Sequence, residues 1–314
     1  MSFVFKFRYL FFLLLLSCSC IFFTGCDSFA KKNSKLSVVS TTGMIHDLVI
    51  NIAGDFVDSK ALMGPGVDPH LYRATESDVL ALAKADIIFY NGLHLEAKLG
   101  DVLKDMADRS QVVAVSDSIS KDLLRMPKEF EGVYDPHIWF DIRLWMKVLN
   151  SIELALISAD PKNKASYQAN AQRYRKELEA LLTFVYSYVE QVPNAQRVLV
   201  TAHDAFGYFG EAFGFEVYGL QGISTQAEAA IYDVNQLASF IANRKIPAIF
   251  VESSISKRQI IAVQEAVKAK GWQVAIGGEL FSDALGAKGT PEGTYIGMLT
   301  HNVTTIVNGL KETP

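Results

Sequence analysis

Residues 160–191, D-P-K-N-K-A-S-Y-Q-A-N-A-Q-R-Y-R-K-E-L-E-A-L-L-T-F-V-Y-S-Y-V-E-Q, carry the pattern that decides the fold of this chain. Asp160 is a good helix N-cap, Pro161 suits the first helical position, and Pro193 lies just beyond the end. Apolar side chains recur at alternating steps of four and three, at Tyr167, Ala171, Tyr174, Leu178, Leu181, Val185 and Tyr188. This pattern predicts one helix, roughly 45 Å long. A single stripe of this kind between two other blocks favours a strut that spans both over a coiled-coil seam.

The segments on either side of this helix alternate between short apolar runs and amphipathic stretches. The predicted strands are 36–42, 57–63, 86–90, 111–115, 197–201, 215–220, 247–252 and 272–276. The predicted helices are 44–53, 75–84, 94–108, 204–213, 233–244, 256–270 and 294–310. This order implies parallel sheets with right-handed crossovers. We therefore predict an α/β protein with two Rossmann-like lobes, residues 36–159 and 192–314, joined by one long rigid helix, residues 160–191.

The first 25 residues have the features of a secretion signal. Lys6 and Arg8 precede a long apolar run, and Phe23-Thr24-Gly25-Cys26 resembles a lipoprotein cleavage box. The alternative is a plain signal anchor. We predict that residues 1–25 are a signal peptide, that Cys26 is lipidated and that residues 26–35 form a polar tether. The protein would then be exported and held by lipid on the periplasmic side of the cell envelope.

Cysteine content and charge narrow the classes of function. The three cysteines are Cys18, Cys20 and Cys26, so the predicted exported domain has no disulfide and no thiolate metal ligand. Removing residues 1–25 reduces the 30 basic residues to 28, against 34 acidic ones. This balance argues against nucleic acid as a partner and mildly favours the handling of cations. No apolar run after residue 25 is long enough to span a bilayer.

Side chains that suit transition metals occur in four separate parts of the chain. They are His70 in G-P-G-V-D-P-H-L-Y, His137 in Y-D-P-H-I-W-F-D, His203 in V-L-V-T-A-H-D-A-F and Asp283 in G-G-E-L-F-S-D-A. His70 and His137 each follow Asp-Pro, whose proline stiffens the loop. His203 and Asp283 each follow an apolar run that is typical of a strand, and open α/β sheets place their ligands after such strands. The residues alone leave open whether the four sites converge.

The composition of this set restricts the metal. Three neutral imidazoles and one carboxylate would leave a divalent ion with one net positive charge. Such a set suits Zn²⁺ and Mn²⁺ and tolerates Fe²⁺. It does not suit Ca²⁺ or Mg²⁺, which prefer oxygen ligands.

Long, ordered motifs over residues 36–310 resemble one family. They are G-P-G-V-D-P-H-L-Y, N-G-L-H-L-E, D-P-H-I-W-F-D, V-T-A-H-D-A-F-G-Y-F, I-F-V-E-S-S-I and G-G-E-L-F-S-D-A. Together they resemble the metal receptors of ABC importers, solute-binding lipoproteins for manganese, zinc or iron. The resemblance implies two α/β lobes joined by one rigid helix, with the ion between them. It implies His70 and His137 as ligands from the first lobe, and His203 and Asp283 from the second. It also implies an ABC permease with its ATPase subunit as partners, and a monomer.

Two departures from this family leave the preferred metal open. Manganese-type members often carry Glu at the position of His203. Zinc-type members often carry a His-rich loop before the second ligand, where this chain has S-K-D-L-L-R-M-P-K-E-F-E-G.

Other residues near the motifs have predicted supporting roles. Asp68 and Asp135 precede Pro-His and are candidates to orient a loop amide or an imidazole, and Glu252 ends a predicted strand. Three aromatic residues are predicted to pack at an interface: Trp139, Phe140 and Trp145. The remaining histidines are predicted to be structural, His46 and His301 on helices and His94 at the start of a helix.

Two other classes of function remain as alternatives. A metal-dependent hydrolase is one, but catalytic zinc usually keeps an open coordination position, and the chain has no H-E-x-x-H motif and no evident nucleophile elbow. A surface adhesin is the other, and no sequence feature requires it. The favoured hypothesis is a binding protein without enzymatic activity.

Overall fold

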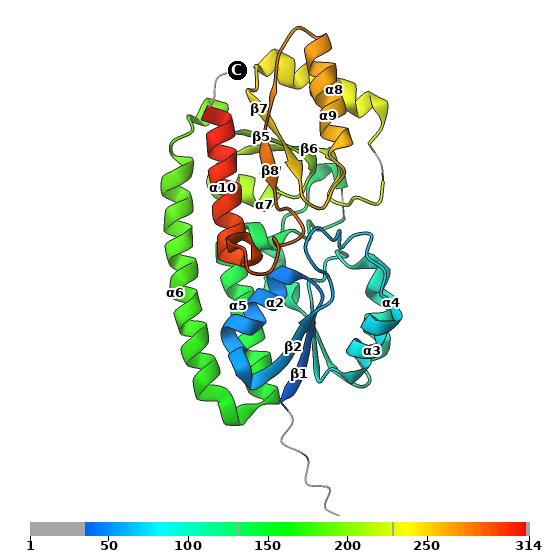
Figure 1. The fold of residues 1–314 in the computed structure, drawn as a ribbon, viewed down its shortest axis with the longest axis vertical. Coiled ribbons are helices and arrows are strands. Elements are labelled where there is room, and N and C mark those ends of the chain that lie inside the picture. The colour runs from blue at the N-terminus through cyan, green and yellow to red at the C-terminus, as the bar shows by residue number, and fades with distance from the viewer. Residues whose placement is uncertain (1–34, 131, 228, 312–314) are drawn as a thin grey trace, which may run out of the picture. The chain divides into compact units, whose positions relative to one another are not determined.

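The first lobe is built on a four-stranded parallel sheet (Figure 1). A computed structural model describes residues 35–130, 132–227 and 229–311. The strand order is β2-β1-β3-β4. The strands are β1 Leu36–Ser40, β2 Val57–Ala61, β3 Ile87–Tyr90 and β4 Gln111–Ala114, and the helices are α2 Gly43–Ala53, α3 Glu76–Lys84, α4 Gly100–Met106 and α5 Ile142–Ala159. The predicted signal peptide, the lipidation site at Cys26 and all of the predicted tether except Lys35 lie outside the described residues.

Alternation along the strands of this sheet separates two cores. Val38 and Phe89 face the core that contains α2 and α5. Val39 and Ile88 point the other way, into a smaller core with Leu82 of α3 and residues of α4. Successive side chains of a strand point to opposite faces, so these apolar runs require helices on both sides. The carboxyl ends of the strands remain free to carry loops.

The second lobe repeats the design with less regular pairing. β5 Val198–His203 pairs with β6 Glu216–Gln221, and β7 Ala248–Glu252 pairs with β8 Ala275–Leu280, both in parallel. β5 and β7 lie next to each other. Helices α8 Ile231–Arg244 and α9 Arg258–Ala269 cover one face and share a core with β5 and β7. The short helix α7, Gly207–Phe213, contributes Phe209 and Phe213 to a large apolar core, which also contains residues of the first lobe.

Helix α6, Lys164–Val189, runs along both lobes, as predicted (Figure 1). It packs against α2 and α5 of the first lobe and against α10, Tyr295–Lys311, of the second. Tyr174 on α6 donates a hydrogen bond from its hydroxyl to the buried carboxylate of Asp47 on α2. The predicted fold class, two α/β lobes with parallel sheets and a long joining helix, is therefore confirmed. The large core is continuous across the two lobes along this helix.

The boundaries of the long helix differ from the prediction at both ends. A short 3-10 turn, Pro161–Asn163, precedes it, and α6 begins at Lys164. Asp160 accepts hydrogen bonds from the side chains of Asn163 and Tyr167 instead of capping a backbone amide of the helix. At the other end Val189 is buried and Tyr188 only partly buried. The predicted stripe is otherwise buried as a whole.

Several other predicted elements were wrong in position. The helix predicted at 94–108 is shorter, since a 3-10 turn at Ala97–Leu99 leads into α4, Gly100–Met106. His94 and its neighbour Leu93 have positive φ angles of 63° and 51°, which exclude them from a right-handed helix. The strand predicted at 272–276 begins at Ala275, where pairing with β7 starts. Helix α5 was not predicted, although its buried positions recur with helical spacing and Asp141 accepts a hydrogen bond from the amide of Arg143 at its start.

No helix among the described residues is both long and apolar enough to cross a membrane.

The construction of the joining helix predicts small motions between the lobes. Bending α6 would break backbone hydrogen bonds and expose a stripe that three other helices cover. We expect solution X-ray scattering to give nearly the same radius of gyration with and without bound metal. A decrease of several ångströms when metal is added would contradict this expectation.

Candidate metal centre

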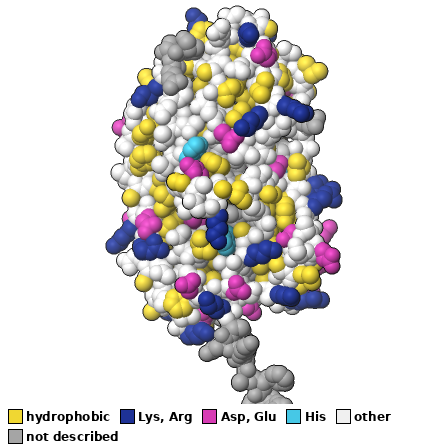
Figure 2. All heavy atoms as spheres, in the orientation of Figure 1, with side chains coloured by type: hydrophobic (Ala, Val, Ile, Leu, Met, Phe, Trp, Pro, Cys, Tyr) yellow, Lys and Arg dark blue, Asp and Glu magenta, His cyan; other side chains and the backbone are white. Residues whose placement is uncertain are grey.

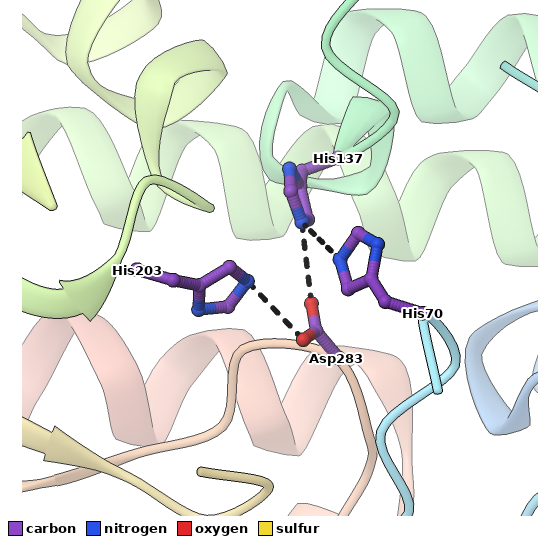
Figure 3. Close-up of side chains that lie close together, drawn as sticks. All are labelled: His70, His137, His203 and Asp283. Atoms are coloured by element: carbon purple, nitrogen blue, oxygen red, sulfur yellow. Dashed lines mark hydrogen bonds and ion pairs between the residues drawn. The ribbon is translucent and has the colours of Figure 1, made fainter. Parts of the chain in front are cut away.

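The four side chains predicted as metal ligands converge on one point between the lobes (Figure 3). His70 lies in the loop between β2 and α3, and His137 directly precedes the 3-10 turn that leads into α5. His203 is the last residue of β5, and Asp283 follows β8 by three residues. Each offers one nitrogen or oxygen atom, and these atoms all lie within 4.8 Å of one another. All four residues are buried, with exposed fractions of 2% or less.

The facing atoms have few partners in the protein. The Nε2 atoms of His70 and His137 are 3.3 Å apart, and His137 Nε2 lies 3.4 Å from Asp283 Oδ1. His203 Nε2 lies 3.2 Å from Asp283 Oδ2. Among the described residues, His203 Nε2 and both oxygens of Asp283 have no hydrogen-bond partner. Buried polar atoms are rarely left so, and a cation at their centre would satisfy all of them at once.

Glu252 orients His203. Its Oε2 atom lies 2.6 Å from Nδ1 of the imidazole, and its Oε1 atom accepts a hydrogen bond of 2.9 Å from the His203 amide. The contact is possible because Glu252 ends β7 next to the end of β5. A carboxylate at Nδ1 holds the proton there and leaves the Nε2 lone pair directed into the site.

Asp135 orients His137 in the same way. Its Oδ1 atom lies 2.7 Å from His137 Nδ1 and accepts a hydrogen bond of 3.0 Å from the His137 amide. Its other oxygen accepts a hydrogen bond of 2.9 Å from Arg125 Nη1. Asp135 is fully buried, so this arginine supplies its charge partner.

Asp68 acts differently, although it also precedes Pro-His. Its Oδ1 atom accepts a hydrogen bond of 2.8 Å from the backbone amide of His70, and its Oδ2 atom accepts one of 2.6 Å from the Thr225 hydroxyl. It therefore fixes the loop that carries His70 and ties this loop to the second lobe. No hydrogen bond joins it to the imidazole among the contacts of the described residues.

Trp139 connects the two lobes beside the site, through a hydrogen bond that the sequence did not predict. Its indole Nε1 donates a hydrogen bond of 2.9 Å to the carbonyl of Ser282, the neighbour of Asp283. Its ring centroid lies 5.2 Å from that of His137. Trp139, Phe140 and Trp145 are all buried, as predicted. The sequence predicted Trp139 as a packing residue. It did not predict the hydrogen bond, because Ser282 is remote in sequence and no local pattern links the two residues.

The other histidines lie outside the cluster. His46 on α2 is within hydrogen-bond distance of Ser59, and His301 on α10 is near the carbonyl of Glu279. His94 is exposed in a turn of positive φ, not at the start of a helix as predicted. It borders a cavity of about 350 Å³ that His70 also lines, with walls from both lobes.

The charges of the cluster divide its histidines into two kinds. Burial lowers the pKa of His70 to about 3, so this imidazole is neutral at pH 7. Burial also opposes a proton on His137, but Asp135 and Asp283 outweigh it and raise the pKa to about 9. In the same way Glu252 and Asp283 raise the pKa of His203 well above 6.5. Without a metal, His137 and His203 therefore hold protons where a divalent ion would place its charge.

Burial disfavours the charged form of Asp283, but His203 and His137 outweigh burial and hold its pKa well below the usual range. The carboxylate is therefore ionised at neutral pH.

Comparison with known proteins identifies the family. The family described as "Zinc-uptake complex component A periplasmic" matches residues 38–309. The chain belongs to this family. It is therefore a substrate-binding protein of the ABC-type metal importers and not an enzyme. Neither alternative, the hydrolase or the adhesin, finds support among the relatives.

Relatives with different metals in their names match nearly the whole chain. The zinc-binding protein TroA of Treponema pallidum is 50% identical over 281 residues, covering 90% of this chain and 91% of TroA. The manganese-binding lipoprotein MntA of Bacillus subtilis is 45% identical over 291 residues, covering 92% and 95%. A solved structure of the Treponema protein superposes with a TM-score of 0.87 at 50% identity, covering 89% of this chain and 100% of that one.

The bond between Glu252 and His203 yields a prediction. We expect Glu252→Gln to weaken metal binding about 10- to 100-fold, because the amide no longer fixes the Nδ1 proton as a carboxylate does. Isothermal titration with Zn²⁺ and Mn²⁺ measures the change. Glu216→Gln is the control, since Glu216 pairs with Arg244 on the surface of the same lobe. Equal affinities of the Glu252 and Glu216 variants would show that the bond does not orient the ligand.

Proposed function

We propose that this protein captures one divalent transition metal ion with His70, His137, His203 and Asp283 and delivers it to an ABC permease driven by an ATPase subunit. The observation that carries the proposal is the convergence of four donor atoms, all within 4.8 Å of one another, from four segments and both lobes. Buried site atoms without a hydrogen-bond partner among the described residues, His203 Nε2 and both oxygens of Asp283, support the assignment.

The donor set favours zinc or manganese as the cargo, with Fe²⁺ also compatible. Three imidazole nitrogens suit these borderline ions, whereas calcium and magnesium prefer oxygen. Relatives named for zinc and for manganese both match at high identity, in agreement with this range. Zinc usually binds such a site more tightly than manganese, so affinity alone does not identify the physiological cargo.

The N-terminal sequence supports a location outside the cytoplasm. The apolar run of residues 9–16 and the box ending at Cys26 are typical of an exported lipoprotein, and MntA of Bacillus subtilis is named a lipoprotein. We propose cleavage before Cys26, acylation of its thiol and attachment to the membrane on the periplasmic side. The acylated receptor would act as a monomer.

Elemental analysis of the protein purified from its native host tests the proposed cargo. We expect close to one transition metal ion per chain, and reduced uptake of that metal in a deletion strain. Protein that carries no transition metal, from a host grown with sufficient metal, would contradict the proposal.

Removal of one ligand tests the assignment of the centre. We expect His203→Ala to weaken binding by roughly two orders of magnitude or more, while the chain stays folded because each lobe keeps its own apolar core. Circular dichroism and titration measure the two properties. His301→Ala is the matched control, since this histidine lies outside the cluster. Near-native affinity of His203→Ala would remove His203 from the ligand set.

The raised pKa values predict that metal and protons exchange. In the metal-free protein the pKa of His137 is raised to about 9 and that of His203 is raised well above 6.5. Both residues must therefore lose a proton from Nε2 to bind metal. We expect about two protons released per ion at pH 7, and affinity that falls about a hundredfold for each unit of decreasing pH near neutrality.

The stability of the metal-free protein should show the opposite dependence. A raised folded-state pKa stabilises the fold below pH 6.5, and this contribution is lost as pH rises through about 9 for His137.

Calorimetric titration of the protein with metal, in buffers of different ionisation enthalpy, counts the protons released on binding. Asp135→Asn removes a carboxylate that raises the pKa of His137, so this variant should release about one proton per ion. No proton release in the unmodified protein would contradict the prediction.

A further inference from the structure

Arg125 lies where the two lobes meet beside the metal centre, and its side chain is only 19% exposed. It belongs to the first lobe, in the segment between β4 and His137. Three carboxylates surround its guanidinium, one from its own lobe and two from the other. They are Asp135, Asp204 and Glu211.

On the side of the first lobe, Arg125 reaches a metal ligand through one intermediate. Its Nη1 atom donates a hydrogen bond of 2.9 Å to Asp135 Oδ2, and Asp135 Oδ1 lies 2.7 Å from His137 Nδ1. Asp135 has no exposed surface, so its charge depends on these two partners. Removing one partner of a buried ion pair leaves an uncompensated charge, which is strongly unfavourable.

On the side of the second lobe, Arg125 holds the segment that follows His203. Its Nε atom donates a hydrogen bond of 3.0 Å to Glu211 of α7, and its Nη1 atom lies 3.7 Å from Asp204 Oδ2. The backbone amide of Arg125 also donates to the hydroxyl of Tyr208, which in turn donates to the carbonyl of Asp135. These contacts join Asp135, which holds His137, to the segment that follows His203 across the interface.

A glycine makes this arrangement possible. A Cβ atom at Gly207, the first residue of α7, would lie 1.9 Å from Arg125 Nη1. Gly207 has an ordinary helical backbone, so the close approach of the guanidinium, and not the backbone angle, requires the absence of a side chain. The chain therefore offers a way to displace Arg125 without removing any charge.

We propose that Arg125 is a latch between the lobes that sets the rate at which the bound ion is released. Separation of the lobes at this point requires the guanidinium to leave Asp204 and Glu211 or to leave the buried Asp135. Either movement costs free energy, and the second also frees His137 to turn. The inference rests on the proposed function and assigns to Arg125 a positioning role with no contact to the ion.

Dissociation of metal from purified protein tests the latch. A chelator in excess traps the released ion, and stopped-flow absorbance of the chelator gives the rate. We expect Arg125→Gln to speed dissociation of Zn²⁺ about tenfold, since it breaks the bond to the buried Asp135 and the contacts to the second lobe. Glu211→Gln should speed it roughly two- to fivefold, because Glu211 is largely exposed. The double variant should be no faster than Arg125→Gln alone.

Three further variants separate a latch from a general structural role. Gly207→Ala keeps every charge but displaces the guanidinium, and should also speed dissociation. Arg125→Lys should lie between the original protein and Arg125→Gln, because one ammonium group cannot reproduce both arms of the fork. Arg244→Gln, which breaks an exposed pair with Glu216 within the second lobe, should leave the rate unchanged. Thermal unfolding of each metal-free variant reports stability independently of release.

The outcomes that overturn the proposal are distinct. An unchanged rate in Arg125→Gln, with a lowered unfolding temperature of the metal-free form, shows a structural role only. A faster rate in Arg125→Gln with native rates in Glu211→Gln and Gly207→Ala shows that Arg125 acts within the first lobe alone, which also overturns the latch. If the original protein binds no ion, or His203→Ala binds as well as the original, the proposed function itself fails.

Discussion

Three imidazoles and a carboxylate meet in this protein almost without exposed surface, and the need to balance charge in that buried place shapes the structure around them. Each ionised group in the interior requires a partner. Asp135 lies at Nδ1 of His137 and Glu252 at Nδ1 of His203, and Arg125 pairs with Asp135 in turn. A divalent ion would bring the same charge as one proton on each of His137 and His203, whose pKa values are raised, so the same carboxylates would suit the protein with and without an ion. Asp135 and Glu252 are therefore as much a part of the site as the four side chains proposed to hold the ion.

The helices behind the site hold together the two lobes that supply the four converging side chains. α2, α5, α6 and α10 form a continuous apolar core that belongs to both lobes, whereas the outer faces of the sheets have smaller cores of their own. A ligand replaced at the interface leaves all three cores intact. In addition, the space-filling view shows charged side chains of both signs scattered among apolar ones over the visible face (Figure 2). On this face, charge of neither sign gathers into one large patch.

The sequence predicted the fold class and singled out the four residues because both leave local patterns, whereas their convergence was implied only by the resemblance to the metal receptors. The stripe on α6 records burial at helical spacing, and Pro before His70 and His137 marks stiff loops. What it could not predict depends on partners remote in sequence. Helix α7 begins at Gly207 and not near Asp204, and Asp204 instead lies in the turn after β5, where its amide donates to the carbonyls of Gln221 and Gly222. The parallel between Asp68 and Asp135 in sequence also failed to reveal that only Asp135 bonds an imidazole. Arg125 carried no signal at all.

The donor atoms of the centre are nitrogen and oxygen only, and the chain has no cysteine beyond residue 26. Thiolate sites change their donors under oxidative stress, because sulfur forms disulfides and sulfenic acids. Imidazole and carboxylate groups do not take part in that chemistry. A receptor that holds its ion as proposed, with nitrogen and oxygen donors alone, would keep the same donors in oxidising and reducing surroundings, and its occupancy would follow the supply of metal and the acidity of the medium instead of the redox state.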